Sequence, residues 1–210
     1  MAHLDLEEQE QLAQLKSWWA TYGNLVVSAL VLAALLFSGW NGWRYWQDRQ
    51  SGAASNLYET LAKATQGTDA KAVRDASGEL LEKYPRTLYA SMGALTSAKY
   101  FFDKNDLKAA KAQLQWVIEN TSSDEFRDIA RLRLANVLMD EKAFDEALKQ
   151  LEAKHGDAFQ SQYALLRGDI LVAKGQSADA KTAYKFALEK AGTKTQQKDQ
   201  IQMRIDALGG

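Results

Sequence analysis

The chain has 210 residues, and its 26 basic and 27 acidic side chains leave a net charge of −1. This balance excludes the basic surface that nucleic acid selects, and the absence of cysteine excludes disulfides, thiolate metal sites and a cysteine nucleophile. Ala, Leu, Gln, Lys and Glu dominate, there is one proline, and no stretch alternates apolar and polar residues as a strand does. We therefore expect an all-α protein that binds no nucleic acid.

Residues 1–21 form a short acidic segment ahead of the first apolar run. Within it, residues 4–19 place Leu12, Leu15 and Trp19 on one helical face, with acidic residues elsewhere. This pattern favours a short helix at a membrane interface, and a disordered acidic tail is the alternative.

Residues 22–43 are predicted to cross a membrane once. They lie in an uncharged run between Lys16 and Arg44, and about 20 helical residues span a bilayer core of about 30 Å. Aromatic residues gather at both ends, as they do at the two interfaces of a membrane. A buried core helix would be shorter and rarely has such belts, and a cleaved signal peptide begins with basic residues where this chain has acidic ones. The predicted interface anchors are Trp18, Trp19, Tyr22, Trp40, Trp43, Tyr45 and Trp46.

Ala34, Ser38 and Gly42 recur at four-residue spacing inside the span, and small residues on one face let another helix approach closely. We expect this face to pack against a second membrane helix, although small residues are also common in membrane helices without such a role. The orientation stays open, because one basic residue precedes the span and two follow it closely, and long domains cross membranes largely regardless of charge.

After a juxtamembrane linker at residues 44–54, residues 55–210 read as amphipathic helices separated by short breaks. The short connections predict antiparallel hairpins. The expected helices are 55–66, 69–83, 87–103, 106–120, 124–141, 143–154, 158–174, 177–190 and 194–208.

Small residues repeat at a nearly constant period along this domain. Ala110, Ala147 and Ala180 are 37 and 33 positions apart, and each follows another small residue by twelve positions: Ala98, Ala135 and Gly168. The pattern resembles the tetratricopeptide repeat, although its consensus Trp and closing Pro are missing and only Gly175 supplies the loop glycine, where Asn105 and Lys142 stand in the other copies. We predict an all-α solenoid with a polar C-terminal cap helix, and an irregular helical bundle is the alternative.

In such solenoids the first helix of each pair lines the concave face. The expected lining is mostly apolar and includes methionine, which adapts to varied shapes, so it suits an extended or helical polypeptide. Ordinary core between repeats is the alternative for each position. The predicted groove residues are Met92, Leu95, Lys99, Phe102, Ile129, Leu132, Asn136, Met139, Gln162, Leu165, Asp169 and Val172.

No motif for catalysis or cofactor binding is found. The two histidines are His3 and His155, and no HxxxH, GxSxG, P-loop or dinucleotide-binding fingerprint is present. We therefore expect no enzyme activity, no catalytic or metal-binding residues and no cofactor.

One known family combines these parts in the same order. The matching text is Gly-Trp-Arg-Tyr-Trp at 42–46, together with residues 103–114, 132–135 and 166–169. In this order, the motifs resemble the YfgM-like family, the ancillary subunits of the bacterial SecYEG translocon, over nearly the whole chain.

The resemblance implies a type II protein of the bacterial inner membrane, with its N-terminus in the cytoplasm and its repeats in the periplasm. It implies three protein partners besides the lipid bilayer: SecYEG, a membrane-anchored periplasmic prolyl-isomerase chaperone and exported polypeptides. The implied role is a non-catalytic adaptor that helps to pass exported proteins to periplasmic chaperones. An envelope-assembly or cell-division scaffold is the main alternative, and an enzyme with an unrecognised site is a third.

Overall fold

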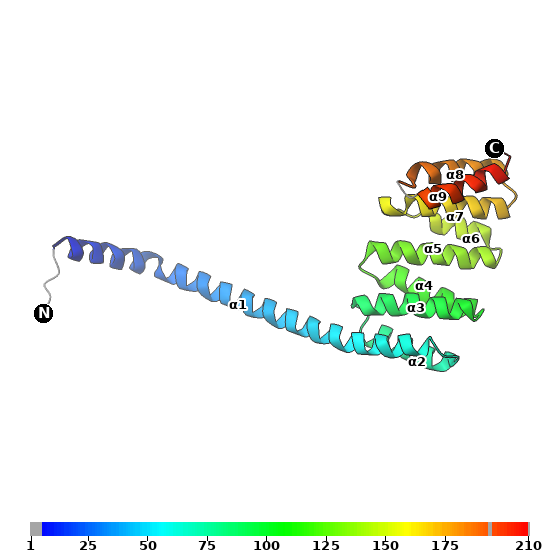
Figure 1. Cartoon of the computed structure of the whole chain (residues 1–210). Helices are drawn as coiled ribbons and strands as arrows, with labels where there is room; N and C mark the ends of the chain where they lie inside the picture. The colour runs from blue at the N-terminus through cyan, green and yellow to red at the C-terminus, as the bar shows by residue number, and fades with distance from the viewer. Residues whose placement is uncertain (1–5, 193–194, 210) are drawn as a thin grey trace. The chain divides into compact units, whose positions relative to one another are not determined.

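The computed structural model describes residues 6–192 and 195–209. Within these ranges the chain forms helices and turns and contains no strand, which confirms the predicted all-α class. The chain divides into two units, residues up to 50 and residues from 51 onward, and each is described by itself (Figure 1).

Helix α1 (Leu6–Ala64) contains the predicted span, and residues 22–43 lie in the first unit. The side chains of Leu25 and Phe37 are 68% and 70% exposed, and most large apolar residues between them are exposed as well. Burying an apolar side chain of this size stabilises by about 1.5–3 kcal/mol, so an apolar environment would favour this surface. Within the described part of the chain, α1 is the one helix that is long and apolar enough to cross a membrane.

Aromatic side chains form contacts at both ends of the span. The ring centroids of Trp18 and Tyr22 are 5.7 Å apart, and those of Trp43 and Trp46 are 5.5 Å apart. At about 1.5 Å per residue, the helix from Tyr22 to Trp43 is about 33 Å long, close to the thickness of a bilayer core. Both groups of rings thus lie where the two membrane interfaces would be.

The structure differs from expectation just after the span. Residues 44–54, expected as a linker, are helical, and residues 55–66 do not begin a new helix, because α1 continues to Ala64. No proline interrupts this stretch, and its one glycine, Gly52, costs only about 1 kcal/mol in a helix interior. The helix expected at 4–19 is likewise part of α1, although residues 1–5 lie outside the described residues.

The second unit is a stack of short helices (Figure 1). Most agree with the predicted ranges to within a few residues, but α6 ends earlier than the predicted helix 143–154, and the helix expected to begin at 158 starts with a 3-10 turn, Asp157–Phe159. The helices are α2 (Ala70–Lys83), α3 (Leu88–Asp103), α4 (Leu107–Asn120), α5 (Asp124–Asp140), α6 (Phe144–Leu151), α7 (Gln160–Ala173), α8 (Ser177–Lys190) and α9 (Thr195–Ala207).

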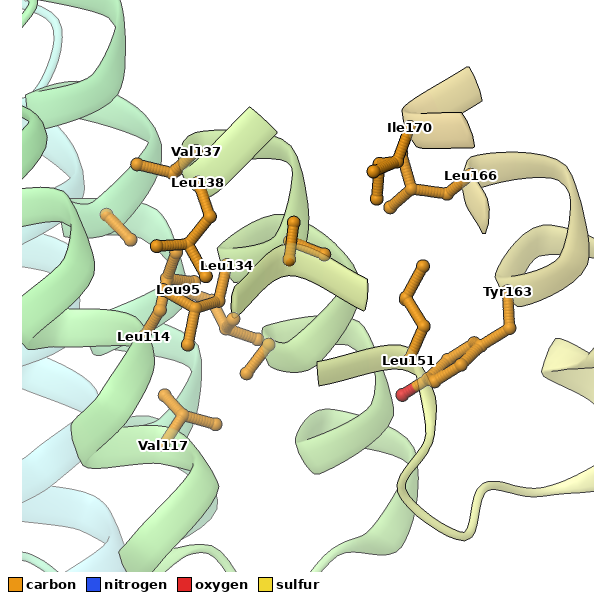
Figure 2. Packing of buried hydrophobic residues seen from close by; sticks show 14 of the residues in the cluster. Leu95, Leu114, Val117, Leu134, Val137, Leu138, Leu151, Tyr163, Leu166 and Ile170 are labelled. Atoms are coloured by element: carbon orange, nitrogen blue, oxygen red, sulfur yellow. The ribbon is translucent and has the colours of Figure 1, made fainter. Parts of the chain in front are cut away.

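Three groups of buried apolar residues hold the stack together. The N-terminal group contains Leu61 and Leu80, and the C-terminal group contains Tyr184, Ile201 and Ile205. Ile201 and Ile205 place α9 over α8, which confirms its predicted role as a cap. The central group joins α3 to α7, as Figure 2 shows, through residues that include Leu95, Leu114, Leu134, Leu151, Tyr163 and Ile170.

The small residues predicted at helix crossings are buried there. Ala98, Ala110, Ala135, Ala147 and Ala180 are at most 2% exposed. Gly168 is the tightest case, because a Cβ at this position would lie 2.2 Å from the ring of Tyr184. The pairs α3–α4, α5–α6 and α7–α8 therefore pack as tetratricopeptide-like hairpins.

Each of these hairpins turns through one residue in the left-handed region of backbone conformation. Asn105, Lys142 and Gly175 have φ values of 60°, 62° and 79°. The next backbone N–H in each turn donates to a carbonyl five residues earlier, which caps the preceding helix as in a Schellman motif. These bonds are Asp106 to Phe101 at 2.8 Å, Ala143 to Leu138 at 2.9 Å and Gln176 to Leu171 at 2.8 Å.

Replacing the strained lysine should stabilise the domain. We expect Lys142→Gly to raise the free energy of unfolding by about 1 kcal/mol, because a residue with a Cβ is strained at this φ and glycine is not. Gly175→Ala is the matched reverse change and should lower it by a similar amount. Urea denaturation followed by circular dichroism measures both, and equal effects of the same sign would contradict this account of the turns.

Candidate protein-binding site

A hollow of about 380 Å³ lies between α3 and α5 and is hereafter the α3–α5 groove. Residues three or four positions apart on each helix point to the same side, so two helical faces form its walls. Leu114 of α4 is a buried residue at its floor. The walls are Ala98, Lys99, Phe102 and Asp103 from α3 and Arg133, Asn136, Val137 and Asp140 from α5.

The charges in the α3–α5 groove are balanced. Lys99 Nζ pairs with Asp103 Oδ2 at 2.6 Å. Arg133 Nη1 donates to the Leu95 carbonyl at 3.0 Å, and burial lowers the pKa of Arg133. Asp140 has no ion pair among the residues that the structure describes. The groove therefore offers an apolar floor with donors and acceptors at its rim, an arrangement that suits a polypeptide side chain and its backbone.

Three of the predicted groove residues, Lys99, Phe102 and Asn136, come together in this hollow. Phe102 is 37% exposed and Val172, on α7, is 40% exposed. The other partly accessible positions are Met92, Ile129, Leu132, Met139, Gln162 and Leu165, of which Ile129, Leu132, Met139 and Leu165 also pack against the core.

Two predicted groove residues have a different role. Leu95 is only 6% exposed and belongs to the central core, so its side chain is not available to a partner. Asp169 Oδ1 accepts hydrogen bonds from Tyr184 Oη at 2.7 Å and Arg204 Nε at 2.9 Å, which joins α7, α8 and α9. Burial, and secondarily the Asp169 carboxylate, raise the pKa of Tyr184.

Sequence reasoning missed Asp103, Arg133 and Asp140 as groove residues. Their signal was present, because each lies one helical turn from a predicted position, or beside one, on the same helix. The prediction assigned four positions, spaced three or four residues apart, from each first helix to the groove. The observed walls also include residues next to these positions on the helix surface.

A buried carboxylate was also missed. Asp128 accepts a hydrogen bond from the Gly156 N–H at 2.9 Å, and Tyr163 Oη donates to its backbone carbonyl at 3.2 Å. Arg131 lies 4.0 Å away. These contacts hold the chain after α6 in a non-helical path, which explains why α6 ends at Leu151.

In the first unit, the face formed by Ala34, Ser38 and Gly42 is exposed. No atom lies within 4 Å of where a Cβ on Gly42 would be, so a second helix has room to approach. Helix packing through this face stays a prediction. Among the described residues, no group of three His, Cys, Asp or Glu side chains could hold a metal ion.

A family model described as a tetratricopeptide repeat-like domain matches residues 16–210. Together with the stacked helix pairs, this match defines a protein with tetratricopeptide-like repeats that follow one helix long and apolar enough to cross a membrane.

Relatives that align over nearly their whole length identify the family within this class. The chain is 32% identical over 206 residues to the ancillary SecYEG translocon subunit of Haemophilus influenzae, with 97% of this chain and 98% of the relative aligned. It is 30% identical over 207 residues to the subunit of the same name from Neisseria gonorrhoeae, covering 97% and 98%, and 28% identical over 201 residues to that of Escherichia coli K12, covering 96% of each. The chain belongs to the family of the ancillary SecYEG translocon subunits.

Asp169 and Asn136 occupy the same position in successive repeats, which allows a matched test of their roles. We expect Asp169→Ala to lower the free energy of unfolding by about 1–3 kcal/mol, because it leaves Tyr184 Oη and Arg204 Nε without their acceptor. Asn136→Ala should change it by less than about 0.5 kcal/mol, because the exposed Asn136 bonds only to a carbonyl of its own helix. Urea denaturation compares the two, and equal losses would contradict a structural role for Asp169.

Proposed function

We propose that this chain is a non-catalytic adaptor of the Sec translocon in the bacterial inner membrane. The observation that carries the proposal is that one chain combines an exposed apolar span with a repeat domain containing a hollow suited to polypeptide. The relatives that match it from end to end are named ancillary SecYEG translocon subunits. In this role α1 anchors the chain in the lipid bilayer, and the repeats contact other proteins.

The proposed orientation places the N-terminus in the cytoplasm and the repeats in the periplasm, as a single-pass type II protein. Exported chains emerge from the translocon on the periplasmic side, so only this orientation lets the repeats meet them. The span would contact membrane helices of the translocon through Ala34, Ser38 and Gly42, because an open small-residue face allows close packing.

The α3–α5 groove is the proposed contact for polypeptide. Its exposed aromatic ring, Phe102, lines the same hollow as buried Leu114 and as Arg133, and aromatic and arginine residues often dominate the energy of protein interfaces. Its proposed partners are exported polypeptides and a membrane-anchored periplasmic prolyl-isomerase chaperone. By holding such partners near the channel, the protein would help to pass newly exported chains to periplasmic chaperones.

A topology measurement tests the orientation. A phosphatase that is active only in the periplasm, fused after Gly210, should be active in intact cells. A fluorescent protein that folds only in the cytoplasm, fused at the same place, should stay dark. The opposite pair of results would refute the proposal, because the repeats could not then meet exported chains.

Site-directed photocrosslinking tests the groove. A photoreactive amino acid at Phe102 should crosslink to a radiolabelled exported protein arrested in the translocon, because this side chain lines the α3–α5 groove and is accessible. The same label at Lys108, an exposed residue of α4 outside the groove, is the matched control and should give little product. Equal yields from both positions, or no product from Phe102, would count against the groove.

A further inference from the structure

The repeat stack is interrupted at α6. The second helix of its hairpin has 8 residues, whereas its counterparts α4 and α8 have 14 each. Six missing residues correspond to about 9 Å of helix. The chain passes through residues 152–156 without helical structure before the 3-10 turn at Asp157–Phe159.

A second hollow, of about 580 Å³, lies where the missing turns would be and is hereafter the α6–α8 hollow. Its floor is buried apolar side chain from α6 and α7, namely Leu151, Tyr163, Ala164 and Leu171, and its far wall is the face of α8 formed by Asp179, Thr182, Ala183 and Phe186. The hollow shares no residue with the α3–α5 groove.

The gap is a built feature, because the segment beside it is held in place by specific contacts. The Gly156 N–H donates to Asp128, Arg131 Nη1 donates to the Lys154 carbonyl at 3.3 Å, and the His155 ring lies 4.1 Å from the ring of Tyr163. Residues 152–156 therefore have partners that a continuing helix would break, and His155 of this segment forms part of the lining of the hollow.

The repeat register shows that the α6–α8 hollow exposes a position that is buried elsewhere in the stack. Ser97, Leu134 and Arg167 occupy the same position in successive repeats. The first two are buried, as core residues should be, whereas Arg167 is exposed and lines the hollow. In the described part of the chain Arg167 has no ion pair or side-chain hydrogen bond. A charged side chain thus faces a space that packing fills elsewhere in the stack.

The same comparison applies to the aromatic residue of the second helices. Trp116 on α4 and Phe186 on α8 are equivalent, and Trp116 is partly buried against the N-terminal and central core groups. Leu81, near the end of the full-length helix α2, packs against the same two groups. Phe186 is 46% exposed, because α6 lacks the turns that would correspond to the end of α2.

We infer that the α6–α8 hollow is a second docking site, and that it receives a short amphipathic helix from a partner protein, with a carboxylate beside its apolar face. Such a helix replaces the missing turns of α6 and lays apolar side chains on Phe186 and the floor. A carboxylate of this helix faces the guanidinium of Arg167, which has no ion pair in the described part of the chain, whereas the opposite wall carries the carboxylate of Asp179. With the α3–α5 groove, this site would let the chain hold two partners at once.

The chain itself supplies a probe. The end of α2 is the equivalent element, because its Leu81 packs against the same two core groups as Trp116 of α4. Its residues 78–83 combine Leu80 and Leu81 with Glu79 and Glu82, and Lys83 pairs with Glu79 at 2.7 Å. A helix-stabilised, fluorescent peptide with the sequence of residues 70–84 should therefore bind the full-length protein in lipid nanodiscs, as measured by fluorescence anisotropy. Stabilisation is required because isolated helices of this length are marginal in water.

Exposed residues provide the test variants. Phe186→Ser and Arg167→Glu should each weaken peptide binding about tenfold, because one removes the apolar anchor and the other reverses the charge. Phe102→Ser, in the α3–α5 groove, is the matched control and should leave binding unchanged. A peptide with Glu79→Lys and Glu82→Lys should bind the wild type poorly and recover affinity for Arg167→Glu.

The inference is overturned if the peptide does not bind the wild type, or if it binds Phe186→Ser and Arg167→Glu as tightly as the wild type. A loss on Phe102→Ser equal to that on Phe186→Ser would also overturn it, because the peptide would then occupy the α3–α5 groove. Circular dichroism of each variant confirms that the helices remain folded. Photocrosslinking from Phe102 tests the α3–α5 groove and not the α6–α8 hollow. A failure of the proposed function can therefore be distinguished from a failure of this inference.

Discussion

Close contact between the two helices of each hairpin is the constraint on which the repeat domain depends. At Gly168 of α7 a Cβ would lie 2.2 Å from the ring of Tyr184 on α8, so this crossing needs a residue without a side chain. The other crossings are occupied by buried alanine. One hairpin cannot bury its apolar face alone, and the tight crossing leaves each hairpin thin enough for the next to share its core. Small residues at twelve-residue spacing thus determine both the pairing within a hairpin and the stacking between hairpins.

The close packing of the helices also decides which side chains remain accessible to a partner protein. Leu95 packs into the central core, whereas Phe102, two turns later on the same helix, stays accessible. Asp169 shows a third outcome, because the cap helix α9 brings Arg204 to it and turns a potential groove residue into a structural one. Partner proteins can therefore bind only where the stack leaves a helix face accessible. Two such places are the α3–α5 groove and the α6–α8 hollow beside the short α6.

The features that sequence could predict are local or periodic. The span is defined by consecutive apolar residues, and the hairpins are defined by small residues and breaks whose effect acts within a few positions. The end of α6 was not predictable in this way, because it depends on a hydrogen bond between Gly156 and Asp128, which is 28 residues earlier. The partners of Asp169, which are 15 and 35 residues away, also come from packing and not from local pattern. The groove residues Arg133 and Asp140 were missed because the width of a wall is set by helix spacing in space.

The division of the core into three groups has a mechanical consequence. Each group is formed by neighbouring helices, so bending at any point of the domain is resisted only by the contacts at that point. The contact between α6 and α7 involves the shortest helix of the hairpins, because α6 ends early. A force applied to α7, α8 and α9 would therefore bend the domain between α6 and α7 before it disturbed the walls of the α3–α5 groove.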